Sequence, residues 1–315
     1  MSVNSKEHLA LVTGGAGFIG GHLVEGLLKA GWLVRVIDDL STGSEQNLAH
    51  AMDRIELTRG DIRDADTLER VMDGVEVVFH QAAMASVPRS IARPLLSNSV
   101  NIDGTLLVLE TARQSGVRRV VYAASSSVYG ETEVLPAVET LPATPLSPYA
   151  LQKYTGEVYC RLYTELHGLE TVSLRYFNVF GPRQNPDSDY AAVIPRFVTA
   201  ALVGKAPVIY GDGEQTRDFI YVENAVQANL LAADADRASG SVVNIAAGKR
   251  TSLNDLWKNI RRIVDTDVEP SYAAPREGDI RDSFADLALA SDLLGYDPGI
   301  GLDEGLARTI ASFRS

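Results

Sequence analysis

The sequence LALVTGGAGFIG at residues 9–20 decides the fold of this chain. Its apolar first half predicts a short buried strand, and its second half opens a helix expected at residues 19–30. Gly14, Gly17 and Gly20 suit a turn that must be tight, must let another group approach its backbone and must let helix pack closely on strand. The helix N-terminus would present its N–H groups and the positive end of its dipole to phosphates. The stretch therefore predicts a dinucleotide-binding turn.

Short apolar runs alternate with longer amphipathic stretches over the first two-thirds of the chain. Further strands are expected at residues 33–37, 75–80, 120–124 and 171–175, and helices at residues 65–72 and 101–115. This alternation predicts an α/β fold with a doubly wound parallel sheet, the Rossmann architecture, covered by helices on both faces. Alone, the glycine motif would be interpreted as an ordinary strand-to-helix turn. Within this alternation of strands and helices it indicates dinucleotide binding.

The composition changes from about Phe177. Gly, Pro, Asp and Asn cluster in residues 178–189, 204–217 and 273–282, with short helices and strands expected between them. This composition predicts a smaller α/β domain whose loops close over a cleft. We therefore expect a dinucleotide-binding domain at residues 1–177, a segment near residues 219–246 that returns to it, and a second domain at residues 178–315.

Acidic residues follow the second expected strand and a third apolar run further along the chain. Asp38 and Asp39 lie roughly twenty residues beyond the glycines, where a carboxylate would bind the ribose hydroxyls of the dinucleotide. A carboxylate there repels a 2′-phosphate, so NAD is favoured over NADP; the alternative is a helix cap or a solvated strand end. Asp61 and Ile62 follow the third apolar run and would lie near the adenine, although Asp is also common in plain loops.

A phenol, an amine and a hydroxyl form the predicted catalytic group. Tyr149 and Lys153 are four residues apart in a stretch expected to be helical, so they share one face. An ammonium beside a phenol lowers the phenol's pKa from about 10, which makes it a usable general base or acid. Ser125, Ser126 and Ser127 follow a strand at the edge where such sheets bind ligands, and which of them serves stays open. Each feature alone is common in structural positions, but their order along the chain favours catalysis.

Composition excludes several other functions. The chain has 315 residues, 45% of them hydrophobic, and a formal net charge of −12, which disfavours nucleic acid as a partner. Cys160, the only cysteine, is expected to be a small buried apolar residue. The five histidines are scattered without metal-ligand spacing, so no metal site is expected. The first residues are polar and no apolar run is long enough to span a bilayer, so we expect a cytoplasmic protein without a membrane partner.

These motifs together resemble the extended short-chain dehydrogenase/reductases, the family of NAD-dependent epimerases and dehydratases. The resemblance covers nearly the whole chain through residues 13–20, 38–43, 80–83, 101–105, 125–130, 149–153, 174–178 and 211–218. Within the family, the chain is most similar to the bacterial UDP-N-acetylglucosamine 4-epimerases, through residues 86–91, 122–127 and 190–195. The resemblance implies reversible inversion at C4 of a UDP-hexose through a 4-keto sugar, with tightly bound NAD.

The resemblance also implies roles for individual residues. Ser125, Tyr149 and Lys153 would be catalytic. The residues implied to bind the cofactor are Gly14, Gly17, Phe18, Ile19, Gly20, Asp38, Asp61, Ile62, Gln81, Ala82, Ala83, Asn101, Tyr149, Lys153 and Tyr176. Those implied to bind the substrate are Ser86, Arg89, Ser126, Ser127, Asn178, Val193, Tyr210, Arg217, Arg276, Asp279 and Ser283. Arginine suits the diphosphate because its planar fork pairs with phosphate oxygens.

Several alternatives within and beyond this family stay open. Ser283 falls where the resemblance implies that a bulky residue would exclude an N-acetyl sugar, so the N-acetylated pair is preferred to UDP-glucose and UDP-galactose. Ser126 and Ser127 replace the Asp-Glu typical of nucleotide-sugar dehydratases, which disfavours dehydration. A non-catalytic NAD-binding protein is disfavoured by the intact catalytic residues. Relatives usually pair as homodimers, here through residues 101–115 and 148–166, although both helices could simply pack on their own sheet.

Overall fold

The structure, a computed structural model, describes residues 8–186, 192–275 and 280–314. The chain forms two compact units that are interleaved along the sequence. The first comprises Met1–Ser125, Ser147–Arg175 and Val226–Val243, and the second comprises Ser126–Leu146, Tyr176–Ala225 and Asn244–Ser315. The first domain expected from the sequence, residues 1–177, included Ser126–Leu146, which here belongs to the second unit.

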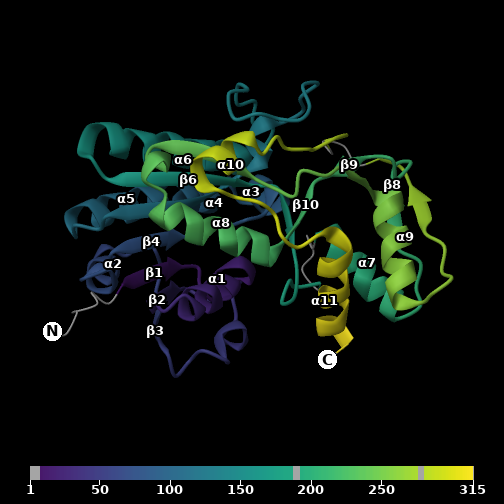
Figure 1. The fold of residues 1–315 in the computed structure, drawn as a ribbon, viewed down its shortest axis with the longest axis horizontal. Coiled ribbons are helices and arrows are strands. Elements are labelled where there is room, and N and C mark those ends of the chain that lie inside the picture. The colour runs from purple at the N-terminus through teal and green to yellow at the C-terminus, as the bar shows by residue number, and fades with distance from the viewer. Residues whose placement is uncertain (1–7, 187–191, 276–279, 315) are drawn as a thin grey trace. The chain divides into compact units, whose positions relative to one another are not determined.

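A seven-stranded sheet forms the centre of the first unit (Figure 1). Its strands are β1 (Leu9–Thr13), β2 (Leu33–Asp38), β3 (Ile55–Arg59), β4 (Val77–His80), β5 (Arg119–Ser125), β6 (Glu170–Tyr176) and β11 (Ser241–Ile245). Their order is β11-β6-β5-β4-β1-β2-β3. Strand β1 pairs in parallel with both β2 and β4, so Thr13 lies beside Ile37 on one side and His80 on the other. The strand order reverses at β1, and such sheets bind ligands beyond the carboxyl ends of the strands at this point. The predicted doubly wound architecture is confirmed.

Helices cover both faces of this sheet because alternate strand residues point to opposite sides. The helices are α1 (Phe18–Lys29), α2 (Ala65–Met72), α3 (Val87–Ala92), α4 (Pro94–Asn98), α5 (Thr105–Gln114), α6 (Pro148–His167) and α8 (Val222–Asp234). Residues of α2, α5 and α6, including Cys160, form one core with Leu11 and Val120. Cys160 is 1% exposed, so the expectation of a small buried apolar residue is confirmed. On the other face α1 packs on β1 and β2, and Gly26 lies against Val226 of α8.

The helix expected at residues 101–115 begins differently from the prediction. A π-helical turn, Ser99–Gly104, precedes α5. This wider turn accompanies a buried side chain, Asn101, whose Oδ1 accepts a hydrogen bond from the N–H of Met84 at 2.8 Å. A partner 17 residues away in the chain is invisible to local periodicity, so the pattern could predict the helix but not its irregular first turn.

The described part of the second unit contains short paired strands, four helices, the first residues of α8 and a connecting segment at residues 130–146. Strand β7 (Asn178–Phe180) pairs in parallel with β10 (Phe219–Tyr221), β8 (Val208–Tyr210) with β13 (Ser271–Ala273), and β9 (Thr216–Arg217) antiparallel with β12 (Thr251–Ser252). The helices are α7 (Val193–Leu202), α9 (Leu253–Val264), α10 (Ala288–Leu294) and α11 (Leu302–Arg314). The rings of Phe197 and Trp257 meet edge to face at 5.7 Å and join α7 to α9.

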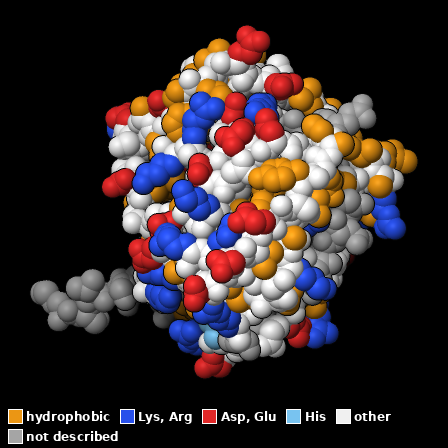
Figure 2. Space-filling model, turned by 90° about the vertical axis from the view of Figure 1, so that its right-hand side faces the viewer, with side chains coloured by type: hydrophobic (Ala, Val, Ile, Leu, Met, Phe, Trp, Pro, Cys, Tyr) orange, Lys and Arg blue, Asp and Glu red, His pale blue; other side chains and the backbone are white. Residues whose placement is uncertain are grey.

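Basic and acidic side chains are mixed on the face that Figure 2 presents. Exposed ion pairs of the chain include Arg262 with Asp303 at 2.8 Å and Arg281 with Asp212 at 2.8 Å. Such exposed pairs contribute little to stability, but their mixture leaves no large area of one sign on that face.

Within the residues that the structure describes, none of the helices combines the length and the apolar character that crossing a membrane requires.

Candidate active site

The glycine-rich turn joins β1 to α1 at the carboxyl edge of the sheet. Gly14 has φ 69°, and a Cβ there would lie 2.7 Å from the Cα of Ala82, so only glycine fits. A Cβ at Gly20 would overlap the carbonyl oxygen of Gly14. At Gly17, by contrast, a Cβ would meet only that same oxygen, at 3.2 Å, among the described atoms within 4 Å. The backbone before Phe18 and Ile19 is thus open to an approaching group, which fits the pyrophosphate of a dinucleotide at a helix N-terminus.

Asp38 ends β2 and turns its carboxylate toward this glycine turn. Its Oδ2 accepts from the N–H of Ala16 at 2.9 Å and its Oδ1 from the N–H of Leu40 at 2.8 Å. Burial raises the pKa of Asp38, and the two backbone hydrogen bonds oppose that rise. A carboxylate can accept about four hydrogen bonds, so acceptor capacity is left for two ribose hydroxyls. Asp39 is exposed, and its Oδ1 accepts from the N–H of Ser41 at 2.9 Å. The structure thus distinguishes two acids that the sequence left equivalent.

The remaining predicted cofactor residues lie around the same edge. Asp61 pairs with Arg63, which lowers the pKa of the Asp61 carboxyl, and Ile62 is buried in the core beside Gly104. Gln81 donates to Asn229 Oδ1 of α8 at 3.1 Å. Ala82 donates its N–H to Thr13 Oγ1 at 3.2 Å, and Ala83 is half-buried. Tyr176, the last residue of β6, belongs to the second unit.

The three predicted catalytic residues lie together in the first unit. Ser125 ends β5, and its side chain is hydrogen-bonded to the phenol of Tyr149. Helix α6 begins at Pro148, where Ser147 caps it by accepting from the N–H of Ala150 at 3.2 Å. Burial raises the pKa of Tyr149, and the bond with Ser125 acts in the opposite direction. Topology and helix spacing thus bring together residues 24 positions apart in the chain, and their roles stay predictions.

Lys153 is buried beneath the strand that ends in Ser125. Its Nζ donates to the carbonyl of Ala123 at 2.7 Å and lies 4.9 Å from the centroid of the Tyr122 ring. Burial lowers the pKa of Lys153 to about 8, while nearby Glu157 acts to raise it. Glu157 is itself held by two hydrogen bonds from Arg175, at 2.9 and 2.7 Å. The ammonium has donors left for the hydroxyls of a bound cofactor, because three N–H groups serve one described carbonyl.

His80 is a buried site residue whose function the sequence did not indicate. Its Nδ1 lies 2.7 Å from Thr13 Oγ1 and its Nε2 lies 3.0 Å from Thr105 Oγ1. Thr105 already donates its proton to the carbonyl of Asn101, so it accepts from His80, and the proton belongs on Nε2. Burial, together with the nearby charge of Lys153, lowers the pKa of His80 to about 3. A neutral imidazole therefore joins β4 to β1 and α5.

Stability should fall with acid because of this histidine. The unfolded chain binds a proton at His80 below pH 6.5, whereas the folded chain does so only near pH 3, so the free energy of unfolding decreases as pH drops from 6.5 toward 3. The limiting slope from one group is about 1.4 kcal/mol per pH unit. Urea denaturation at pH 7.0 and 5.0 should show a smaller loss in His80→Gln than in the wild type. The exposed His167→Gln variant is the control, and equal losses in all three proteins would contradict the assignment.

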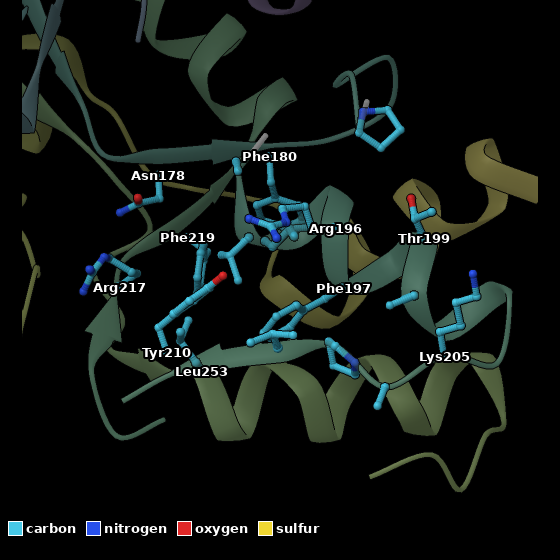
Figure 3. Close-up of a pocket in the computed structure, with 18 of the residues that line it drawn as sticks. Asn178, Phe180, Arg196, Phe197, Thr199, Lys205, Tyr210, Arg217, Phe219 and Leu253 are labelled. Carbon is cyan, nitrogen blue, oxygen red and sulfur yellow. The ribbon is translucent and has the colours of Figure 1, made fainter. Parts of the chain in front are cut away.

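A pocket of about 720 Å³ lies within the second unit (Figure 3). Four predicted substrate residues line it: Asn178, Val193, Tyr210 and Arg217. Asn178 and Arg217 lie at one end of the view, and Lys205 and Thr199 at the other, with the aromatic rings of Phe180, Phe197, Phe219 and Tyr210 between them. The pairing of β7 with β10 places Asn178 beside Phe219, and its N–H donates to the carbonyl of Asp218 at 3.1 Å. Amide, guanidinium and aromatic groups around one cavity suit a nucleotide.

Other lining residues were not expected from the sequence. Arg196, Thr199 and Lys205 come from α7 and the loop after it, and Gln215 precedes β9. Gln215 donates its amide N–H to the carbonyl of Tyr210 at 2.6 Å, and within the described residues its buried Oε1 has no hydrogen-bond partner. An isolated cation or amide on an amphipathic helix or in a turn carries no spacing signal, so only the fold gathers these groups.

The other predicted substrate residues that the structure describes do not line this pocket. Ser86 caps α3 in the first unit by accepting from the N–H of Arg89 at 3.3 Å. Ser126 and Ser127 form part of a 3-10 turn at the start of the second unit. Ser283 is half-buried, with its N–H donating to the carbonyl of Thr216 at 3.1 Å. Arg276 and Asp279 lie outside the described residues.

The fold and the glycine turn define a dinucleotide-binding enzyme of the doubly wound α/β class. Residues 10–246 match the model of the NAD dependent epimerase/dehydratase family, and the chain belongs to this family of extended short-chain dehydrogenase/reductases, whose cofactor is NAD. The chain is 41% identical over 304 residues to a putative UDP-glucose 4-epimerase of Methanocaldococcus jannaschii, covering 96% of this chain and 97% of that protein.

Solved structures agree with this assignment. One is a UDP-N-acetylglucosamine 4-epimerase from Methanobrevibacter ruminantium in complex with UDP-N-acetylmuramic acid, with TM-score 0.94 and 42% identity over 98% of this chain and 99% of that one. Another is a UDP-glucose 4-epimerase from Thermotoga maritima with UDP-glucose, with TM-score 0.93 and 40% identity over 97% and 98% of the two chains.

Proposed function

We propose that this chain inverts C4 of a UDP-hexose and that its preferred pair is UDP-N-acetylglucosamine and UDP-N-acetylgalactosamine. The observation that carries the proposal is the cluster of Ser125, Tyr149 and Lys153 in the unit that holds the dinucleotide turn. In this proposal the first unit holds NAD, and the pocket of the second unit holds the nucleotide diphosphate through Asn178 and Arg217.

The residues of the chain manage the proton in this reaction. Tyr149, as phenolate, takes the proton of the sugar 4-hydroxyl, and Ser125 holds the same oxygen by a hydrogen bond. Lys153 supplies a positive charge that favours the phenolate. Bound NAD would supply reversible hydride transfer at C4, so that oxidation and reduction would cancel over one turnover. Tyr149 returns the proton after the 4-keto sugar has presented its opposite face.

UDP-glucose and UDP-galactose are the second candidate pair, because relatives 41% identical to this chain carry the name UDP-glucose 4-epimerase. The preference for N-acetylated sugars is supported by the structural relative that is a UDP-N-acetylglucosamine 4-epimerase and by the small side chain of Ser283. Dehydration is disfavoured because Ser126 and Ser127 offer no carboxyl group to remove water.

Product analysis tests the proposal directly. The protein is incubated with each UDP-sugar, and proton NMR follows the anomeric and H4 signals. We expect UDP-N-acetylglucosamine to give the galacto isomer until equilibrium, without added NAD if the cofactor stays bound. Conversion of UDP-glucose alone would support the second pair, and loss of water or conversion of none of these sugars would refute epimerisation.

We also infer that two copies of the chain pair through residues 101–115 and 148–166, as the resemblance implies, and that α3 and α4, which pack on α6, extend this contact. The large exposed apolar side chains Ile91 of α3, Leu95 of α4 and Leu151 of α6 are 61%, 86% and 52% exposed, on helices that pack together. Exposed apolar side chains on helices that pack together suit a twofold contact between copies. Light scattering should give twice the mass of one chain, and Leu95→Glu should halve it. The control is Leu33→Glu, at an exposed position of β2. A wild-type monomer would refute the pairing.

A further inference from the structure

Gln152 lies between Tyr149 and Lys153 on α6 and is 3% exposed. Its Oε1 accepts two hydrogen bonds, from Ser97 Oγ at 2.7 Å and from Asn101 Nδ2 at 2.8 Å. Ser97 belongs to α4 and Asn101 to the π-helical turn, and both are fully buried or nearly so. One amide oxygen therefore joins the catalytic helix to two neighbouring elements.

The orientation of both amides follows from a single backbone group. The N–H of Met84 can only donate, so the atom of Asn101 that faces it, at 2.8 Å, must be the oxygen Oδ1. The Nδ2 of Asn101 then faces Gln152, which must present its own oxygen. The arrangement requires an acceptor on the side chain at position 152.

The same network reaches the dinucleotide turn. Met84 comes two residues after Ala82, whose N–H is held by Thr13 Oγ1 and whose backbone packs against Gly14. The segment that contains Ala82 and Met84, to which Asn101 is hydrogen-bonded, therefore also borders the glycine turn. The path from the turn to α6 passes through Ala82, Met84, Asn101 and Gln152, and every link is a backbone connection, a close contact or a hydrogen bond.

We propose that Gln152 is a positioning residue, whose amide oxygen sets the placement of Tyr149 and Lys153 relative to the cofactor turn. The inference rests on the proposed function, because it concerns the rate of that reaction. A buried polar network contributes little net stability over an apolar one, but it specifies one arrangement of the elements it joins. Catalysis is sensitive to such placement, since a displacement of about 1 Å can lower the rate by about 100-fold.

The test compares Gln152→Met with Gln152→Glu. Methionine has similar length but offers no good acceptor to Ser97 and Asn101, whereas glutamate keeps carboxyl oxygens in place. The matched control is Thr171→Val, which removes a buried hydroxyl bonded to the carbonyl of Cys160 at 2.8 Å near the other end of α6. Measurements are kcat and KM for the UDP-sugar, retained NAD, Tm and hydrogen exchange of the amides of residues 149–153.

We expect Gln152→Met to lower kcat about 10- to 100-fold with KM nearly unchanged, and Gln152→Glu to recover most of it. Thr171→Val should lower Tm while keeping kcat. Ser97→Ala, which removes one of the two bonds, gives a smaller loss and serves if Gln152→Met does not fold. Equal kcat in the wild type, Gln152→Met and Ser97→Ala would overturn the inference, as would a Glu variant no better than Met. A wild type that turned over no UDP-sugar would refute the proposed function. Hydrogen exchange tests the positioning role separately: unchanged exchange of the amides of residues 149–153 in Gln152→Met would overturn the inference.

Discussion

Tyr149→Phe is expected to lower kcat for the epimerisation about 1,000-fold while leaving NAD bound. The phenol is the group that Ser125 contacts at the end of β5, and phenylalanine keeps the ring but cannot carry the proton. Burial raises the pKa of Tyr149 in the protein alone. The proposed mechanism therefore requires the charge of Lys153 and the bound cofactor to lower it. The effect should therefore fall on kcat far more than on substrate affinity.

The measurement is initial rates by coupled assay or NMR, together with the absorbance of NAD released on denaturation. Tyr159→Phe is the matched control, because Tyr159 is a half-buried phenol on the same helix and should keep wild-type kcat. A Tyr149→Phe enzyme with wild-type rates would remove the proposed base. A variant that loses NAD as well as activity would show that the hydroxyl serves to hold the cofactor.

The sheet and the Tyr149–Lys153 pair were predictable because their signals are local. Residues 65–72 were expected to be helical and form α2 over the same span, and β1 follows its apolar run at residues 9–13. Helix spacing places Tyr149 and Lys153 on one face, and parallel topology places Ser125 at the carboxyl edge. These predictions need only the period of the hydrophobic pattern and the order of the strands along the chain.

Other site features depend on partners far apart in the chain. His80 meets Thr105, 25 residues away, and Gln152 meets Asn101, 51 residues away, so neither has a motif of its own. The acceptor role of Gln152 follows only from the orientation of Asn101, which Met84 sets. The cations of the pocket in the second unit, Arg196 and Lys205, likewise look like ordinary surface residues until the fold gathers them around one cavity. The burial and charged neighbours of such residues depend on which distant segments pack together, and the amino-acid composition does not reveal that.

The substrate preference can be tested at one position of the second unit. Ser283→Tyr is expected to lower kcat/KM for UDP-N-acetylglucosamine on the order of 100-fold and to change that for UDP-glucose little. Ser283 is half-buried, and its N–H donates to the carbonyl of Thr216, the residue before Arg217. A tyrosine side chain at position 283 would therefore take up space near the residue proposed to bind the diphosphate. An acetamido group needs the room that a small residue leaves, whereas a 2-hydroxyl does not.

Paired assays of both sugars distinguish this loss from general damage. Ser291→Tyr, on an exposed position of α10, is the control and should leave the ratio of the two kcat/KM values unchanged. Affinity for UDP, measured by calorimetry, should be similar in both variants, since neither changes Asn178 or Arg217. If Ser283→Tyr lowered both sugars equally, the bulk at position 283 would act on the nucleotide and not on the N-acetyl group. If it lowered neither, the size of this side chain would not limit which hexose is accepted, and the choice of sugar would have to lie with other residues.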